Sequence, residues 1–177
     1  MDQADVQIQL VGAFGYFFLA NSYFNKNKNM ILNMQIVANV FLAIHYFCLS
    51  GIVGAVCDVV SIVANTIIYF FNKNNCKNKQ LLAELLILFL IISCFITLFI
   101  LKKPITIHEV FPVIATIMVI LSFVTNSKNV IRGIGLIVAV CWLIYGFIFG
   151  SYSAIIFEIL IILSTIISHF REKRQNH

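Results

Sequence analysis

The chain has 177 residues, of which 61% are hydrophobic and only 11% are charged, and its formal net charge is +5. A soluble domain carries about 25% charged residues, so this composition excludes a soluble fold and predicts a protein that is solvated by lipid. The positive charge does not indicate nucleic-acid binding, because the 12 Lys and Arg residues lie in short polar segments and at the C-terminus. Anionic lipid headgroups are the expected partners.

Seven apolar segments follow one another along the chain, each close to the roughly 20 residues that a membrane-crossing helix needs. The expected helices cover residues 6–24, 30–49, 52–71, 81–101, 107–125, 130–149 and 152–170. The start MDQADVQIQL has no basic segment and no small-residue cleavage site, so a retained helix is expected there rather than a signal peptide. Four of the five cysteines lie in apolar runs and are expected to be buried.

Two of the breaks between helices are marked only by small residues. The apolar runs around Ser50-Gly51 and Gly150-Ser151 are each about 40 residues long, which is twice one membrane span. Small residues at the midpoint allow a tight turn. Each run is therefore predicted to form a helical hairpin.

The distribution of charge predicts the orientation in the membrane. With seven spans, the loops after the first, third and fifth helices share one side with the C-terminus, and that side carries ten Lys and Arg residues. The other side carries Lys102 and Lys103, and the N-terminal segment carries Asp2 and Asp5. Positive residues favour the cytoplasmic side. We therefore expect a multi-pass protein of the cytoplasmic membrane with its N-terminus outside and its C-terminus in the cytoplasm.

The sequence also contains an internal repeat. When residues 11–71 are shifted by 100, they align with 111–171 without a gap, and ten of the 61 positions are identical. Asp58 aligns with Glu158, the one acidic residue within each matching block. The predicted organisation is a first three-helix repeat (1–71), a cytoplasmic loop with a linker helix (72–104), and a second three-helix repeat with a basic tail (105–177). A repeat with an odd number of helices needs such a linker if both copies are to be parallel in the membrane.

Several short motifs resemble the YgjV-type bacterial inner-membrane proteins over nearly the whole chain. The resemblance is carried by Gly12, Phe24-Asn25, Gln35, His45-Tyr46, Gly54-Ala55, Phe111-Pro112, Trp142, Tyr145, Gly150-Ser151 and Glu158. Such proteins resemble the SWEET and PQ-loop families, which implies a 3+1+3 helix arrangement and a transport function. The chain departs from that pattern, because it has no PQ dipeptide and the repeat proline occurs only once, as Pro112 with Gly12 opposite.

Asp58 and Glu158 are the most informative candidates for a solute-binding site. A charged residue in the middle of a membrane helix costs about 2.5–3.5 kcal/mol on insertion scales, so such residues often have a function. The two carboxyls could line a central path and bind a polar solute or a proton. The structural alternative is a carboxyl that is hydrogen-bonded to a neighbouring helix or held protonated.

His45 and Tyr145 are candidates because they lie at nearly the same depths as Asp58 and Glu158 in adjacent antiparallel helices. Equal depth predicts a direct or water-bridged hydrogen bond between His45 and Asp58 if both face inward. Such a bond could be a static clamp that holds the hairpin closed, or it could share a proton.

Three further residues are weaker candidates. As SWEET-like bundles use an asparagine on the third helix to contact solute, the resemblance implies this role for Asn65, with interhelical hydrogen bonding as the alternative. Trp142 could stack on a sugar or anchor the helix at the membrane interface. Pro112 is predicted to act as a hinge in the fifth helix. Glu84 and Glu109 lie near helix ends and are expected to be solvated.

No nucleophile–base pair, phosphate-binding loop or metal-ligand spacing occurs in the sequence, so neither an enzyme nor a cofactor or metal site is expected. A small-solute transporter is the leading hypothesis. The alternative is a non-transporting membrane protein, such as a receptor, sensor or accessory subunit. The small-residue pair Gly146 and Gly150 also allows a homo-oligomer, although packing within the chain is favoured.

Overall fold

The computed structural model describes residues 3–24, 28–73, 78–102, 106–122 and 128–175. Within these ranges the chain forms seven α-helices, and a short 3-10 helix precedes the fifth. The helices are α1 (Gln3–Phe24), α2 (Lys28–Cys48), α3 (Ile52–Lys73), α4 (Lys79–Ile100), η1 (Ile107–Glu109), α5 (Val110–Ser122), α6 (Lys128–Phe149) and α7 (Tyr152–Gln175). The prediction of an all-α protein with seven helices is confirmed.

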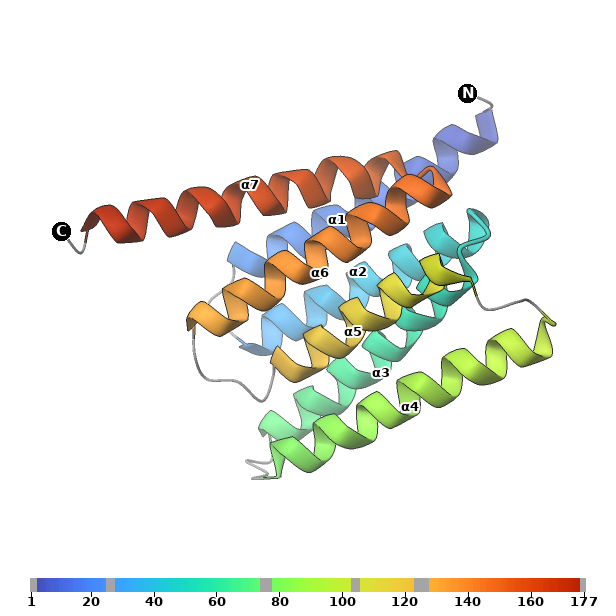
Figure 1. The fold of residues 1–177 in the computed structure, drawn as a ribbon, viewed down its shortest axis with the longest axis horizontal. Helices are drawn as coiled ribbons and strands as arrows, with labels where there is room; N and C mark the ends of the chain where they lie inside the picture. Colours follow the sequence, from blue (N-terminus) through green and yellow to red (C-terminus); the bar gives the residue numbers. More distant parts are fainter. Residues whose placement is uncertain (1–2, 25–27, 74–77, 103–105, 123–127, 176–177) are drawn as a thin grey trace.

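The helices run alternately in opposite directions, as Figure 1 shows. The helices α1, α3, α5 and α7 all end on one side of the bundle, which we call the basic end. The hairpin turns between α2 and α3 and between α6 and α7 lie on the other side, which we call the turn end. This alternation is what the predicted distribution of charged loops requires.

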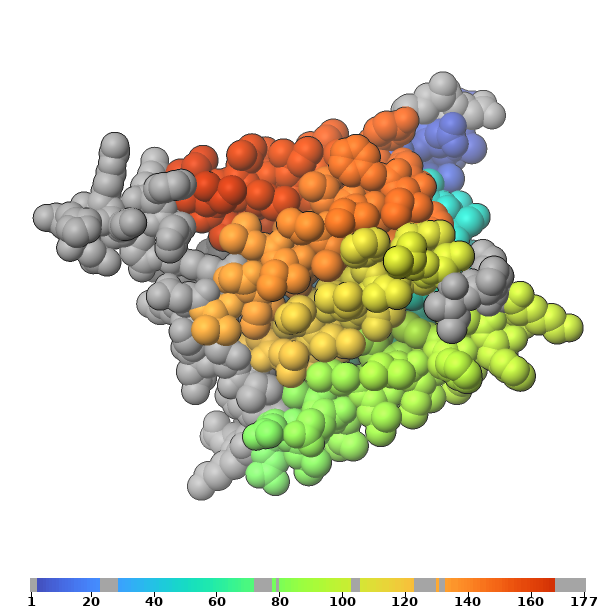
Figure 2. Space-filling view, in the orientation of Figure 1, coloured from blue at the N-terminus to red at the C-terminus, as the bar shows by residue number. Residues whose placement is uncertain are grey.

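Six of the helices form a ring in which each packs against two neighbours, in the order α1, α2, α3, α5, α6, α7 and back to α1. The helix α4 lies outside this ring and packs on α3 and α5. Figure 2 shows α4 along the edge of the molecule beside α5. One junction of the ring, between α3 and α5, is thus covered by α4.

Both predicted turns are confirmed, and both end the preceding helix in the same way. The N–H of Gly51 donates a 2.8 Å hydrogen bond to the carbonyl of Tyr46, and the N–H of Ser151 donates a 2.9 Å bond to the carbonyl of Gly146. Each bond spans five positions and encloses a residue with left-handed backbone, as in a Schellman motif. The positions of the two motifs differ by 100 residues.

The left-handed residue of each turn gives a stability prediction. It is Ser50 (φ 63°) in the first turn and Gly150 (φ 66°) in the second. A side chain at such a φ costs about 1 kcal/mol. We expect Ser50→Gly to raise the melting temperature in detergent by about 2–4 °C. The matched variant Ser93→Gly, in the interior of α4, should lower it; a decrease with Ser50→Gly would contradict the prediction.

The bundle has an apolar surface, and its largely apolar interior also contains polar and charged side chains. Large apolar side chains are exposed on all seven helices, whereas several polar and charged side chains are buried. The buried group includes Ser22, His45, Asp58, Asn65, Thr116, Ser151, Ser153 and Glu158. Such extensive exposed apolar surface is stable only in contact with lipid.

The lengths of the apolar stretches agree with this environment. Three described stretches are long and apolar enough to cross a membrane: Asn29–Cys48, Ile52–Phe71 and Gln80–Ile100. Three shorter apolar helices follow, at Ile107–Ser122, Gly133–Phe149 and Tyr152–Ile167.

The expectation for the cysteines is confirmed for three of them. Cys57, Cys94 and Cys141 are buried free thiols, whereas Cys48 is exposed at the end of α2. Cys57 and Cys94 belong to the apolar cluster that joins α3 to α4. Cys76 lies outside the described residues.

Candidate functional site

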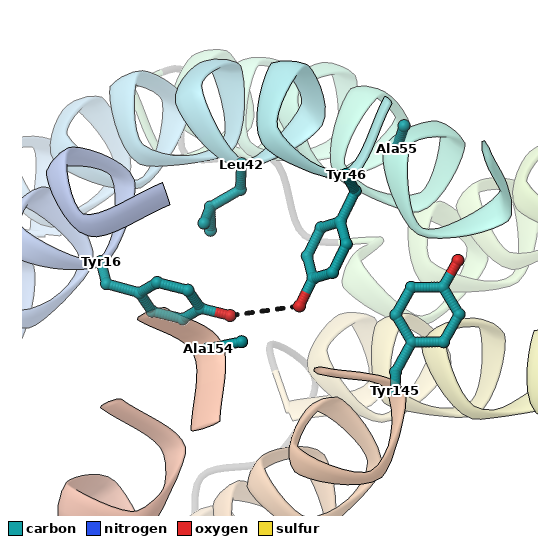
Figure 3. Close-up of a cluster of buried hydrophobic side chains, with 6 residues drawn as sticks. All are labelled: Tyr16, Leu42, Tyr46, Ala55, Tyr145 and Ala154. Atoms are coloured by element: carbon teal, nitrogen blue, oxygen red, sulfur yellow. Dashed lines mark hydrogen bonds between the residues drawn. The ribbon is translucent and has the colours of Figure 1, made fainter. Parts of the chain in front are cut away.

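Four aromatic side chains fill the space between opposite helices of the ring. Tyr16 comes from α1, Tyr46 from α2, and Trp142 and Tyr145 from α6, and the three tyrosines are almost completely buried. The ring of Tyr46 lies 5.3 Å from those of both Trp142 and Tyr145. Figure 3 shows Tyr16 and Tyr46 pointing toward one another, with 3.4 Å between their hydroxyl oxygens. This cluster closes the centre of the bundle.

Two contacts then connect each half of the ring to the hairpin turn of the other half. His45 Nε2 lies 2.6 Å from the hydroxyl of Ser151 at the start of α7, and its Nδ1 lies 2.8 Å from the carbonyl of Ile8. On the opposite side, the N–H of Gly54 donates a 3.0 Å hydrogen bond to the hydroxyl of Tyr145. We call the His45–Ser151 and Tyr145–Gly54 contacts the turn clasp. His45 and Tyr145 occupy equivalent positions, 100 residues apart, and both reach across the ring.

The junction between α1 and α7 strengthens the clasp. The side-chain amide of Gln9 donates to the carbonyl of Gly150 over 2.9 Å, and its oxygen accepts a 3.2 Å bond from the N–H of Ser153. Gly12, one turn further along α1, leaves room for the side chains of His45 and Ser153, which a Cβ atom there would meet. Polar contacts thus hold the turn end of the bundle closed on this side.

Asp58 and Glu158 lie beyond the clasp, toward the basic end. Each is six residues into its helix, which corresponds to about 9 Å at 1.5 Å per residue. Their exposed fractions are only 3% and 4%. The Oδ2 atom of Asp58 is buried and has no hydrogen-bond partner among the described residues. The structure therefore contains two buried carboxyls at equivalent positions of α3 and α7.

The two central tyrosines lie in the electrostatic field of both carboxyls. Tyr16 and Tyr46 each interact electrostatically with both Asp58 and Glu158. Stacking of Tyr16 on Phe157, at 5.2 Å between ring centroids, places Tyr16 beside α7.

The predicted hydrogen bond between His45 and Asp58 is wrong. Both ring nitrogens of His45 have other partners, Ile8 and Ser151. The clamp exists, but it joins α2 to α1 and α7 instead of holding the α2–α3 hairpin closed. Equal depth in adjacent helices did not bring the two side chains together, because the imidazole points toward the other half of the ring.

The other three candidates lie in three different parts of the bundle. Asn65 is buried two turns beyond Asp58 on α3, at 4% exposure. Trp142 is stacked on Tyr46 inside the bundle, so it is not an interfacial anchor. Pro112 lies in the first turn of α5, directly after η1, where its missing N–H leaves no helical hydrogen bond unmade. It marks the junction of two helix types rather than a bend within one helix.

One expectation about the helix ends must be corrected. Glu84 is exposed on α4 as expected, but Glu109 is buried, with an exposed fraction of 9%. The reason is that η1 packs against α6, where His108 contacts the ring of Phe149. A residue near the end of a helix is thus covered by its neighbour.

Sequence reasoning missed the roles of Tyr16, Gln9 and the two serines Ser151 and Ser153. A signal was available for the serines, which follow a predicted turn in the pattern Ser-x-Ser, where hydroxyls can bond to the helix start. The signal for Tyr16 was weaker, because a tyrosine in an apolar helix is usually a packing residue. Among the described residues, no group of three or more His, Cys, Asp or Glu side chains is arranged to bind a metal ion.

Searches of curated proteins and of solved structures find no match to this chain. The family model for the bacterial inner membrane protein Imp-YgjV matches residues 6–176. This match covers nearly the whole chain, including both hairpins, the clasp residues and the two buried carboxyls. The protein belongs to the Imp-YgjV family of bacterial inner membrane proteins.

Proposed function

We propose that this protein is a small-solute transporter of SWEET-like architecture, in which α1–α3 and α5–α7 are two parallel three-helix units joined by α4. The helix boundaries support this division, because α2 and α6 begin at Lys28 and Lys128, and α3 and α7 begin at Ile52 and Tyr152. The two pairs of starting residues differ by 100 positions, like the two turns.

The order of helices around the ring supports the same proposal. A two-fold rotation that exchanges the units converts the order α1, α2, α3, α5, α6, α7 into itself. The junction of α3 with α5 then corresponds to the junction of α7 with α1. Parallel repeats related by an axis along the membrane normal are typical of transporters that move two halves against each other.

The observation that carries the transport proposal is the combination of a two-sided clasp with buried carboxyls behind it. The turn clasp joins the two units through a few polar contacts at the turn end, and such contacts can break when the units rock apart. Asp58 and Glu158 lie just beyond it, where separation of the units would expose them. A purely structural bundle has no need for two carboxyls at that position.

The orientation completes the proposal. From the charge distribution we infer that the basic end faces the cytoplasm and the turn end faces outside. With that orientation, the clasped structure is the form of the transporter that is closed to the outside. The solute would bind between the units, near the carboxyls, Asn65 and Trp142.

The proposal is tested by uptake into proteoliposomes with a panel of sugars, amino acids, organic acids and amines. We expect one class of solute to enter faster than into protein-free vesicles. Asp58→Asn should then reduce the initial rate by about tenfold or more, the effect of losing about 1.4 kcal/mol of interaction. The matched variant Glu84→Gln, on the exposed face of α4, should keep the wild-type rate.

Absence of flux for every class of solute, with protein that is folded and oriented in the vesicles, would contradict transport. The alternative, a non-transporting receptor, sensor or accessory subunit, would then be preferred. The close packing of Tyr16, Tyr46 and Tyr145 fits this alternative if the packing persists in every state of the protein. A pair of introduced cysteines that forms a disulfide across the turn clasp would then leave the function of the protein unchanged.

A further inference from the structure

The two buried carboxyls have no basic residue in the stretches of chain that contain them. No Lys or Arg occurs in the chain between residues 29 and 72 or between 133 and 170, the stretches that contain Asp58 and Glu158. The two ring nitrogens of His45 contact the carbonyl of Ile8 and the hydroxyl of Ser151. An ionised carboxylate is very costly in an apolar interior unless a cation or a set of hydrogen-bond donors compensates it.

Hydrogen bonding does not supply the missing compensation for Asp58. An ionised carboxylate can accept about four hydrogen bonds, yet Oδ2 of Asp58 has no donor among the described residues. A protonated carboxyl needs far less, because it is neutral and its OH group is itself a donor. The geometry at Asp58 therefore fits a carboxylic acid better than a carboxylate.

A metal cation fits the same place poorly. Hard cations such as Ca²⁺ and Mg²⁺ require about six or more oxygen ligands at short distances. The described residues hold no cluster of three or more potential acidic or histidine ligands. Two carboxyls on helices α3 and α7, without further ligands of these types grouped around them, provide single binding positions for a proton rather than one cage for a metal ion.

Two tyrosine hydroxyls lie in the same part of the bundle. The hydroxyl oxygens of Tyr16 and Tyr46 are 3.4 Å apart, and either can donate to the other. Both tyrosines interact electrostatically with both carboxyls. A hydroxyl both donates and accepts, so this pair adds polar O–H groups near the carboxyls without adding charge to the interior.

We propose that Asp58 and Glu158 are a pair of proton-binding sites that couples solute movement to protons, and that the nearby hydroxyls of Tyr16 and Tyr46 assist them. The inference rests on the proposed transport function and specifies its coupling ion. In the clasped state each carboxyl holds a proton. When the units separate and water enters, each acid releases its proton to that side and becomes a carboxylate, and reclosure requires that a proton is bound again.

The other titratable groups around the pair do not change this assignment. They are Tyr16 on α1, His45 and Tyr46 on α2, Cys57 on α3, Cys94 on α4, Glu109 in η1 and Tyr145 on α6. None is a Lys or Arg. Glu109 interacts with Cys94 and Tyr145, whereas Asp58 and Glu158 interact with Tyr16 and Tyr46.

The first test uses N,N′-dicyclohexylcarbodiimide, an apolar reagent that modifies protonated carboxyls in apolar surroundings. The acid O–H adds across a C=N bond of the reagent, and the adduct rearranges to a stable N-acylurea without a leaving group or oxidant. Purified full-length protein in detergent is treated between pH 5 and pH 9, and each carboxyl is followed by peptide mass spectrometry. We expect labelling of Asp58 and Glu158 that decreases as the pH rises.

The exposed carboxyl of Asp5, in the first turn of α1, is the internal control and should label weakly throughout. Asp58→Asn and Glu158→Gln should each lose one adduct while the other carboxyl still reacts. Equal labelling of Asp5, or no adduct at Asp58 and Glu158 at any pH in folded protein, would overturn the proposal. Protection of both carboxyls by NaCl but not by choline chloride at fixed pH would also overturn it, because the sites would then bind Na⁺.

The second test measures coupling in proteoliposomes with a solute identified by the uptake panel. We expect an inward proton gradient to accelerate wild-type uptake several-fold, and a protonophore to abolish that acceleration. Tyr16→Phe and Tyr46→Phe should reduce the acceleration but retain uptake down a solute gradient. An uptake rate that does not depend on the proton gradient would overturn proton coupling but not transport. Labelling of both carboxyls without any solute flux would instead support the proton-binding sites and contradict transport.

Discussion

Replacing His45 by alanine is expected to lower the melting temperature in detergent by roughly 6–12 °C, which corresponds to about 3 kcal/mol for a chain of this size. The imidazole is completely buried and contacts both α1 and α7 through Ile8 and Ser151. Its removal leaves a cavity and breaks two interhelical hydrogen bonds. Thermal unfolding of the purified variant, followed by tryptophan fluorescence or circular dichroism, measures the loss.

Two further variants separate the clasp from a general effect of truncation. His45→Gln keeps an amide that can bond to the same partners, so it should recover at least half of the lost stability. Phe47→Ala removes a larger ring two positions away, but Phe47 is 68% exposed on the lipid-facing surface, so its effect should be small. Equal losses for His45→Ala and Phe47→Ala would show that His45 does not join the two halves.

Gly54→Ala is expected to lower the melting temperature by roughly 4–8 °C, since overpacking a closely packed interior costs about 2 kcal/mol. A Cβ atom at Gly54 would lie 2.5 Å from Cε1 of Tyr145. That ring cannot easily move away, because Phe149 lies 4.5 Å and Tyr46 5.3 Å from it. The displaced hydroxyl would also lose its bond from the Gly54 N–H.

A matched glycine on α6 provides the control for this prediction. A Cβ atom at Gly133 would meet nothing within 4 Å, so Gly133→Ala should raise stability by up to about 1 kcal/mol through helix propensity alone. In a Tyr145→Ala background, Gly54→Ala should lose most of its cost, which a double-mutant cycle measures. A melting temperature for Gly54→Ala at or above that of the wild type would disprove the close contact.

The number of helices and the places where they turn could be predicted from the sequence because both depend on local features. Long apolar runs cross the bilayer, and small residues at positions 50, 51, 150 and 151 form the turns, in which Ser50 and Gly150 have left-handed backbone. The predicted boundaries agree with the structure within a few residues, except that the fifth helix begins as the 3-10 helix η1 before Pro112.

The depth of each candidate residue was also predictable, because depth follows from the position along a helix at 1.5 Å per residue. The direction in which a side chain points was not. An apolar helix in lipid has no polar outer face that would indicate its rotation, so the helix faces are chosen by packing against neighbours. The prediction for His45 and Asp58 was right about the depth of both residues but wrong about the direction in which the His45 side chain points.

The amino-acid sequence by itself determined that this is a seven-helix inner-membrane protein with two carboxyls at matching positions within its helices. These features depend on composition, run length and the offset of 100 residues, all of which are properties of the linear sequence. Only the tertiary structure decided that both carboxyls are buried, that His45 bonds to Ser151, 106 positions away, and that the hydroxyls of Tyr16 and Tyr46 meet. Those contacts depend on how each helix is rotated within the ring, and that rotation is set jointly by the side chains of several helices.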